Sequence, residues 1–317
     1  MKHLFFFLLL IITAFSCNSN KNERNNTEIS ITSNQDNLKI AVMPTTDCLP
    51  FYYAEKTGIF KSHGLNITLE TYNAQMDCDT AISRGHVDIA YSDLIRSILL
   101  QSKGTGLRVI MGTNGYHELI VSKNKRIQGI EQLKERIIAI SRHSVTDFTL
   151  DTIVKRTSIN ADYVFHPQIN DITIRYNMLM NSTIDGAILP EPYATQAKLF
   201  GHNSIYCTQN DSIYLMTFIA TEKCYNNTKK RELLNKLLIA YDEAATQINQ
   251  RKDTLKIRET LLELPIQTNI VDSIKIPNYA TPYKQPRQKE IDIAMKFLKN
   301  RMLIKQDYTS DSLLYKF

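Results

Sequence analysis

Short apolar runs and longer amphipathic stretches alternate along the chain from Leu38 onward. The first run, "LKIAVM", is rich in β-branched residues and predicts a strand, and the following "FYYAEKTGIFKSHG" predicts a helix that ends at Gly64. The alternation continues with strands expected in "NITLETY", "VDIAYSD" and "LRVIMGT" and helices in "CDTAISRG" and "LIRSILLQSKG". Strands that alternate with helices of this length indicate a parallel sheet covered on both faces, so we predict an α/β fold.

A second α/β unit begins near Asn114. Its expected strands are "ELIVSK", "IIAISR", "GAIL", "SIYCTQ" and "IYLMTFIATEK", and its expected helices are "GIEQLKERI", 146–156 and "ITIRYNMLMN". A long amphipathic helix, "KKRELLNKLLIAYDEAATQIN", and a final helix after the proline-rich "IPNYATPYKQP" follow. No long linker separates the units, so we predict two lobes with a cleft between them: residues 38–113 in lobe I, residues 114–225 in lobe II, and residues 226–317 as a helical return to lobe I.

The N-terminus has the pattern of an export signal. Lys2 and His3 precede an apolar run that is too short to cross a bilayer as a stable helix, and small residues precede Cys17. This resembles a bacterial lipobox, which predicts a signal peptide over residues 1–16 and a lipid on Cys17. Ordinary signal cleavage with a chance cysteine is the alternative. Residues 17–37 are Asn-rich and polar, which predicts a flexible tether and a protein of the periplasm or cell envelope held at a membrane.

Composition narrows the remaining classes. The chain has 317 residues, of which 43% are hydrophobic, and its net charge of +6 contains no block of five or six basic residues. We therefore expect a solvated surface and no binding of nucleic acid. Neither a C-x-x-C nor an H-E-x-x-H motif occurs, so no metal or cofactor is predicted. The remaining cysteines form either two disulfides, Cys48–Cys78 and Cys207–Cys224, or free thiols.

Polar side chains follow several of the expected strands. The carboxyl ends of parallel strands meet at one edge of a sheet, where ligands of such folds bind. Each of these residues also suits the start of a helix as an N-cap. Their accumulation nevertheless predicts a pocket for a small polar molecule, lined by Thr45, Thr46, Asp47, Ser92, Asp93, Asn114, Ser144, Thr146, Glu191 and Tyr193.

The segment "LPEPYATQA" fixes Glu191 between two prolines. Pro190 lacks an amide N–H and ends a strand, whereas Pro192 disfavours the helical region for Glu191 and suits the first position of a helix. Glu191 then lies at the carboxyl end of a strand and the N-terminus of a helix. Its carboxylate either caps that helix or anchors a donor group of a ligand.

The stretch "LPFYYAEKTGIFKSHGLNITLETYNAQMDCDTAISRGHVDIAYSDL" resembles the start of exported solute-binding proteins of ABC importers, in the group that includes binders of nitrate, sulfonates, taurine and thiamine-pyrimidine precursors. Gly58 to Phe60, Gly85 to Asp88, "LPEPYATQA" and the proline-rich tail carry the resemblance. It implies a type II periplasmic-binding fold whose two lobes, each a mainly parallel sheet flanked by helices, close on a small solute. The implied partner is an ABC permease, and the implied state is a monomer.

The charged residues bear on the solute. Arg142 is expected in the cleft together with Asp47, Asp93, Asp147 and Glu191, and these acids and several tyrosines favour an amine-bearing or aminopyrimidine-like solute. The alternative is an anion of the sulfonate, taurine or nitrate type, if the acids face away. A lipoprotein that presents its solute to a receptor is a further alternative. An enzyme like the cousin of this fold that makes the thiamine pyrimidine is disfavoured, because that enzyme needs pyridoxal phosphate and clustered cysteines.

Overall fold

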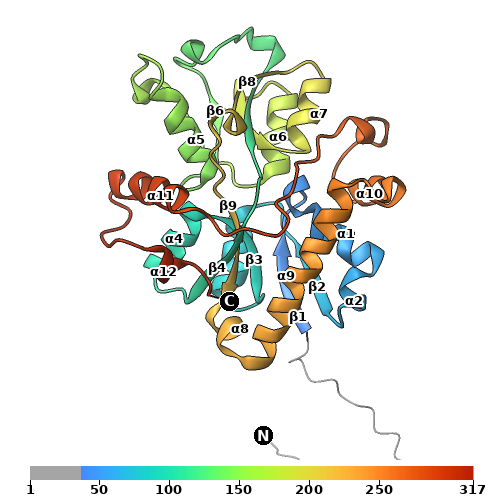
Figure 1. The fold of residues 1–317 in the computed structure, drawn as a ribbon. Helices are drawn as coiled ribbons and strands as arrows, with labels where there is room; N and C mark the ends of the chain where they lie inside the picture. The colour runs from blue at the N-terminus through green and yellow to red at the C-terminus, as the bar shows by residue number, and fades with distance from the viewer. Residues whose placement is uncertain (1–36, 317) are drawn as a thin grey trace, which may run out of the picture. The chain divides into compact units, whose positions relative to one another are not determined.

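The computed structural model describes residues 37–316, which form two lobes linked by several chain crossings (Figure 1). The predicted signal peptide, Cys17 and all but the last residue of the predicted tether lie outside the described residues. Within the described range, no helix combines the length and the apolar character that crossing a membrane requires.

Lobe I contains a five-stranded sheet in the order β2-β1-β3-β9-β4. β1 pairs parallel with β2 and β3, whereas β9 runs antiparallel between β3 and β4. Four strands therefore point the same way, and their carboxyl ends meet at the edge that faces lobe II. The strands are β1 (Asn37–Val42), β2 (Asn66–Thr71), β3 (Ile89–Asp93), β4 (Leu107–Gly112) and β9 (Met216–Thr221).

The helices of lobe I follow the predicted order. The single predicted helix after β1 is broken at Gly58, which adopts a positive φ of 79° that favours glycine, so that two helices form in its place. Pro50 lies in the first turn of the first helix, where its missing N–H costs nothing. The helices are α1 (Leu49–Thr57), α2 (Ile59–Ser62), α3 (Gln75–Ser83) and α4 (Leu94–Ser102).

Lobe II contains a four-stranded sheet in the order β6-β7-β5-β8, in which only β5 runs against the others. The predicted helix "GIEQLKERI" is wrong: only a 3-10 turn, Ile130–Gln132, forms there. The chain reverses after that turn at Glu135, whose φ of 60° cannot continue a helix. The elements are β5 (His117–Val121), β6 (Ile138–Ala139), α5 (Val145–Val154), α6 (Ile172–Met180), β7 (Gly186–Pro190), α7 (Tyr193–Leu199) and β8 (Asn203–Cys207).

The predicted end of lobe II at residue 225 requires correction. Residues Met216–Thr221 form β9, which inserts between β3 and β4 of lobe I, so lobe II ends by residue 215. All six residues of β9 are buried. A strand buried on both faces is a continuous apolar run in sequence, and such a run does not reveal which sheet receives it.

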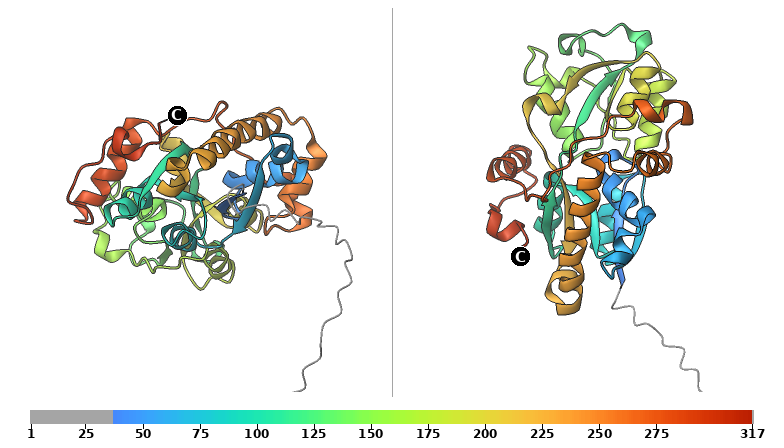
Figure 2. Two further views of the ribbon diagram at one scale, coloured as in Figure 1. Left: turned by 90° about the horizontal axis from the view of Figure 1, so that it is seen from below. Right: turned by 45° about the vertical axis from the view of Figure 1, so that its right-hand side comes forward.

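Residues 222–316, which we call the return segment, are mainly helical and pack on lobe I (Figures 1 and 2). The longest helix, α9, buries a stripe that includes Leu234, Leu237, Leu238 and Tyr241, as its periodicity predicts. The loop after α10 crosses between the lobes and pairs with Gly112 of β4 through Lys284. The helices are α8 (Glu222–Asn226), α9 (Thr228–Asn249), α10 (Thr254–Leu261), α11 (Gln288–Asn300) and α12 (Ser310–Leu313).

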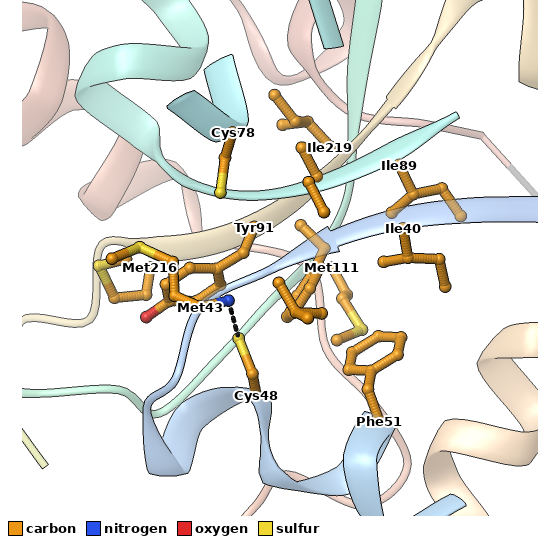
Figure 3. Packing of buried hydrophobic residues seen from close by; sticks show 14 of the residues in the cluster. Ile40, Met43, Cys48, Phe51, Cys78, Ile89, Tyr91, Met111, Met216 and Ile219 are labelled. Atoms are coloured by element: carbon orange, nitrogen blue, oxygen red, sulfur yellow. Dashed lines mark hydrogen bonds between the residues drawn. The ribbon is translucent and has the colours of Figure 1, made fainter. Parts of the chain in front are cut away.

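The core of lobe I joins the sheet to the return segment. The ring of Phe51 lies 4.6 Å from that of Phe218 and 5.3 Å from that of Tyr241, centroid to centroid. Figure 3 shows Cys48 and Cys78 among these buried side chains, with the backbone N–H of Met43 donating to the Cys48 sulfur. Cys48, Cys78, Cys207 and Cys224 are free thiols, so of the two predicted alternatives the free form is found.

Direct contacts join the two lobes at one side of the seam between them. The guanidinium of Arg301, just after α11, lies 3.2 Å from the Asp147 carboxylate and 3.5 Å from that of Asp151, both in α5. The rings of Phe148 and Phe297 meet edge to face at 5.7 Å beside this pair. Because these contacts link α5 of lobe II to α11 on lobe I, separation of the lobes would break them.

We predict that Arg301→Gln shifts the protein toward a more open form. An ion pair that is about one-third exposed contributes on the order of 1 kcal/mol, so the apparent affinity for a solute should fall by up to about fivefold. Small-angle X-ray scattering should show a larger radius of gyration for the variant. Lys299→Gln, which removes an ion pair to Asp307 on the same lobe, is the matched control and should leave both measurements unchanged.

Candidate functional site

A small cavity of about 20 Å³ lies between the two sheets and is lined by both lobes. This volume holds no more than one or two water molecules, so the lobes are tightly closed around it. Its lining residues contain an arginine and a histidine but neither an aspartate nor a glutamate. Its polar lining consists of Thr45, Gln75, Tyr91, His117, Ser141, Ser144, Thr146, Asn170 and Arg175.

Arg175 is the one fully charged group that lines this cavity. It lies on α6 with only 4% of its surface exposed, and its Nη1 donates to the carbonyl oxygens of Ile169 (2.7 Å) and Asn170 (3.2 Å). Among the described residues no carboxylate forms an ion pair with it, and its Nε has no hydrogen-bond partner. Burial lowers the pKa of the guanidinium to about 10, so it remains charged at neutral pH. The charge of Asp171, at the N-cap of the same helix, opposes this shift without forming an ion pair with Arg175. A buried cation with no directly paired acid is costly, and a bound anion would relieve that cost.

Two further buried polar atoms at the same cavity lack partners. These are Oγ1 of Thr45, from the loop after β1, and Nδ1 of His117, the first residue of β5. Burial, together with the nearby charge of Arg175, lowers the pKa of His117 to about 3, so the imidazole is neutral at physiological pH. A neutral imidazole and a hydroxyl can each donate a hydrogen bond to an anion or accept one from a donor. Residues with unpaired buried atoms from both lobes therefore line the same cavity.

The N-terminus of α5 forms another wall of the cavity. Ser144 is its N-cap and accepts from the amide of Thr146 (3.2 Å), while the Thr146 hydroxyl accepts from the amide of Ser141 (2.8 Å). The Asp93 carboxylate reaches across from lobe I and accepts from the amide of Val145 (3.0 Å) and from Gln75 (2.9 Å). Asp93 also caps its own helix, α4, through the amide of Arg96. The amide of Val145 at the start of α5 is therefore already hydrogen-bonded to the Asp93 carboxylate.

A second cavity of about 10 Å³ adjoins the first, and Tyr91 and Pro190 line both. Its acidic residues are Asp47 and Glu191. Asp47 accepts hydrogen bonds from Tyr91 (2.8 Å) and Thr113 (2.5 Å) on Oδ2, but Oδ1 has no partner. Burial raises the pKa of Asp47 to about 6, although the two hydroxyl donors oppose the shift. The two cavities therefore carry opposite charge.

Glu191 lies at the wall of the second cavity and is bonded within lobe II. Its Oε2 accepts from the amide of Thr195 (3.0 Å) and its Oε1 from the hydroxyl of the same residue (2.8 Å). The hydroxyl of Tyr116 donates to Oε1 at 3.3 Å. Pro192, which follows a cis peptide bond, is the N-cap of α7, one position earlier than predicted. The Glu191 carboxylate therefore caps α7, which is the first of the two predicted roles.

Three of the remaining predicted residues, Ser92, Asn114 and Tyr193, lie beside the cavities without lining them. Ser92 donates to Asp79 (3.3 Å), Asn114 donates to the carbonyl oxygen of Asn278 (2.7 Å), and Tyr193 shares a hydrogen bond with Thr173 (3.1 Å). Thr46 lines the second cavity and donates its amide to the Glu191 carbonyl oxygen. The side chain of Arg142, which we expected in the cleft, is exposed and lines neither cavity.

Sequence reasoning missed Arg175 and His117. A signal for Arg175 was present, because Ile172, Arg175 and Leu179 follow the spacing of one buried helix face and are indeed buried. An arginine on an apolar stripe is a rare residue that requires a partner. No comparable pattern marks His117. No group of three or more potential metal ligands occurs among residues 37–316.

We predict that Asp47→Asn removes part of the pH dependence of stability. The folded pKa of about 6 exceeds the ordinary value of 3.8, so the native state binds the proton more tightly and the free energy of unfolding falls as pH rises from about 4 to 6. The variant should lack this loss, which amounts to up to about 3 kcal/mol. Urea unfolding of both proteins at pH 4 and pH 7 measures the difference. The exposed Asp77→Asn should follow the unaltered protein, and equal pH slopes for all three would contradict the assignment.

One family model matches most of the chain. Residues 45–253 match the family model described as NMT1/THI5 like. In sequence, none of the curated proteins matches the chain.

Solved structures match over most of the chain at low identity. One is the ligand-binding component of an ABC-type import system from Staphylococcus aureus with zinc bound (TM-score 0.75, 12% identity, 88% of this chain and 96% of that one). Another is the alkanesulfonate-binding protein SsuA from Xanthomonas axonopodis pv. citri bound to MOPS (0.74, 12%, 86% and 95%). The nitrate-binding protein NrtA from Synechocystis PCC 6803 also matches (0.63, 12%, 71% and 65%).

At these identities the structural matches establish the fold, and the predicted two-lobed periplasmic-binding-protein fold is confirmed. The family model spans well over half of the chain and carries the assignment of the family. The chain belongs to the NMT1/THI5-like family.

Proposed function

We propose that the chain is an extracytoplasmic solute-binding lipoprotein of an ABC importer. Its family, its fold, and structural neighbours named as ABC-type or periplasmic binding proteins support this role. The signal-peptide pattern and Cys17 support export and attachment to a membrane by lipid. The partners are then a small solute and a membrane permease, and the binding protein acts as a monomer.

The observation that carries the choice of solute is Arg175. A buried guanidinium that forms no ion pair, beside the unpaired atoms of Thr45 and His117, suits an oxyanion such as a sulfonate or a carboxylate. The amine preference inferred from sequence assumed that Asp47, Asp93, Asp147 and Glu191 face the solute. None of these four carboxylates lines the cavity that contains Arg175. We therefore place an anionic group of the solute at Arg175.

The second cavity, which is lined by Asp47 and Glu191, suits an amine group of the solute. Asp47 has an unpaired oxygen there, and this cavity meets the first along Tyr91 and Pro190. An ammonium or amidine nitrogen on the same solute would pair with Asp47 and offset the desolvation of that carboxylate. The solute is thus a small organic anion, and a compound with an amine at its other end matches the charges of both cavities. The lobes must move apart to admit it, because cavities of about 20 and 10 Å³ hold only water.

Binding couples to closure because the proposed contacts come from both lobes. Thr45 and Asp47 belong to lobe I, whereas His117, Ser144 and Arg175 belong to lobe II. A solute that touches both sets binds the closed form more tightly than the open form and shifts the population toward it. The closed form is then what a permease recognises. A role in sensing instead of transport would use the same closure. Finding permease and ATPase genes beside this one would favour transport, and their absence would favour sensing.

We predict that organic anions stabilise the protein in a thermal-shift screen and that Arg175→Met weakens the effect. Charge-assisted hydrogen bonds contribute about 1.5–3 kcal/mol, so the affinity should fall by roughly 10- to 100-fold. Ethanesulfonate, taurine, ethylamine and an aminopyrimidine form the panel, in which the zwitterion taurine should stabilise most. Arg156→Met removes an exposed ion pair to Asp211 in the same lobe and is the matched control. Stabilisation by the amine or the aminopyrimidine alone would overturn the anion assignment and restore the amine-binding alternative.

Attachment to a membrane has its own test. We predict that Cys17→Ala moves the exported protein from the membrane fraction to the soluble fraction, because the variant has no thiol to carry lipid. Fractionation with immunoblotting measures the change, and mass spectrometry of the N-terminal peptide identifies the lipid. Cys78→Ala, at a buried free thiol, is the control and should stay with the membrane. A membrane-bound Cys17→Ala protein would contradict lipidation at this residue.

A further inference from the structure

The positive charge of the chain is concentrated in its last third. Residues 216–317 contain eighteen Lys and Arg against twelve Asp and Glu, which leaves twenty of each in the rest of the chain. The entire net charge of +6 therefore belongs to β9 and the return segment. Such an imbalance within one folded unit points to a partner of negative charge.

Some of these basic residues lie near other cations at the end of lobe I that is farthest from lobe II. An open groove of about 760 Å³ there joins the turn after α3, the residues before β4, α8 and the start of α9. Arg84, Lys223 and Lys230 line it together with two acids, Asp88 and Glu222, and Lys103 follows α4 two residues before the lining residue Thr105. We call this surface the basic end, made of Arg84, Lys103, Lys223, Lys229, Lys230 and Arg231.

The start of α9 makes the basic end more positive. Its first turn contains Lys229, Lys230 and Arg231 and no acidic residue. The macrodipole of this 22-residue helix places a further partial positive charge at the same point, so cations there are unfavourable for the helix itself. Lys230 pairs with Asp88, whereas no ion pair involves Lys229 or Arg231 among the described residues. Neither the helix nor a neighbouring acid therefore accounts for these two side chains.

The chain enters the folded unit at this same end. β1 starts at Asn37, and the amide of Lys39 donates to Asp88, which lines the groove (3.1 Å). In Figures 1 and 2, α8 and the start of α9 lie at the end of lobe I where β1 begins. Nineteen residues separate Cys17 from Asn37. The tether predicted over these residues would span about 25 Å on average, so a lipid on Cys17 would keep the basic end close to the bilayer.

We propose that the basic end is a docking surface for the anionic headgroups of the membrane to which the protein is attached. This inference rests on the proposed export and lipid attachment at Cys17. Each Lys or Arg near an anionic bilayer contributes about 1 kcal/mol, and the tether raises the local concentration of headgroups. Docking through this end turns the carboxyl ends of the lobe I strands, and hence the solute cavities, away from the lipid. The solute then reaches the cleft from solution.

The test is co-sedimentation with vesicles of the mature chain, residues 17–317, carrying Cys17→Ser so that no lipid is attached. Vesicles of phosphatidylglycerol and phosphatidylcholine in a ratio of about one to two should bind it at low ionic strength, and pure phosphatidylcholine vesicles should not. The triple variant Lys223→Glu, Lys229→Glu, Arg231→Glu should bind at least about 100-fold more weakly, at about fivefold per lost cation.

A matched triple variant of exposed lysines elsewhere on the return segment, Lys289→Glu, Lys296→Glu, Lys305→Glu, changes the net charge equally and should lose less than about threefold. Equal loss in both variants would show a response to net charge alone and would overturn the proposal. So would an absence of binding to the anionic vesicles, or displacement by inorganic phosphate beyond that by chloride at equal ionic strength, which would indicate a discrete phosphate site. Solute binding by both variants should stay unchanged, so that failure of this proposal is distinct from failure of the proposed function.

Discussion

The hydrogen bonds of the Asp93 carboxylate tie the two lobes into one closed unit. From the end of β3 it caps α4 in its own lobe and accepts from the amide of Val145 at the start of α5 in the other. The group is buried, and burial raises its pKa, because a carboxylate loses solvation that these donors only partly replace. Its hydrogen bond from the Val145 amide forms only when the start of α5 meets the end of β3. The cavities beside it exist in their observed form only in that arrangement, so the geometry of the proposed solute site depends on this contact.

The same carboxylate affects which charges remain available to a solute. The N-terminus of a helix ordinarily attracts anions, but at α5 an amide already binds Asp93. The positive group left for a solute is then Arg175, whose hydrogen bonds are to carbonyl oxygens and not to an acid. Asp47, which lines the second cavity, has one carboxylate oxygen without a hydrogen-bond partner. In the closed form, Asp93 and the N-terminus of α5 are therefore bonded to each other. Arg175 and Asp47 are left in the two neighbouring cavities without a directly paired charge.

The fold was largely predictable because its elements depend on local patterns. Apolar runs of strand length and the apolar stripe of α9 each correspond to the expected element, whereas Gly58 divides one expected helix into two. The prediction failed where tertiary context decides the outcome. β9 joins lobe I instead of lobe II, and the stretch around Ile130–Gln132 forms only a turn before Glu135 reverses the chain. Both outcomes are compatible with the same local pattern of apolar residues, so the periodicity of the sequence does not predict either of them.

The site was less predictable than the fold, for a physical reason. Polar residues after strands do gather at the seam, as expected from parallel sheets, and Thr45, Thr46, Asp47, Ser144, Thr146 and Glu191 line its two cavities. The sequence does not show which of these polar side chains form hydrogen bonds with other groups of the protein. Glu191 does so by capping α7, and Asp93 by bridging the lobes. The chemistry that remains is carried by atoms with no internal partner, and the strongest of these belongs to Arg175, on a helix face that periodicity assigns to the core. Unpaired buried atoms are a better guide to a binding site than the type of residue, because burial without a partner is a cost that a solute can remove.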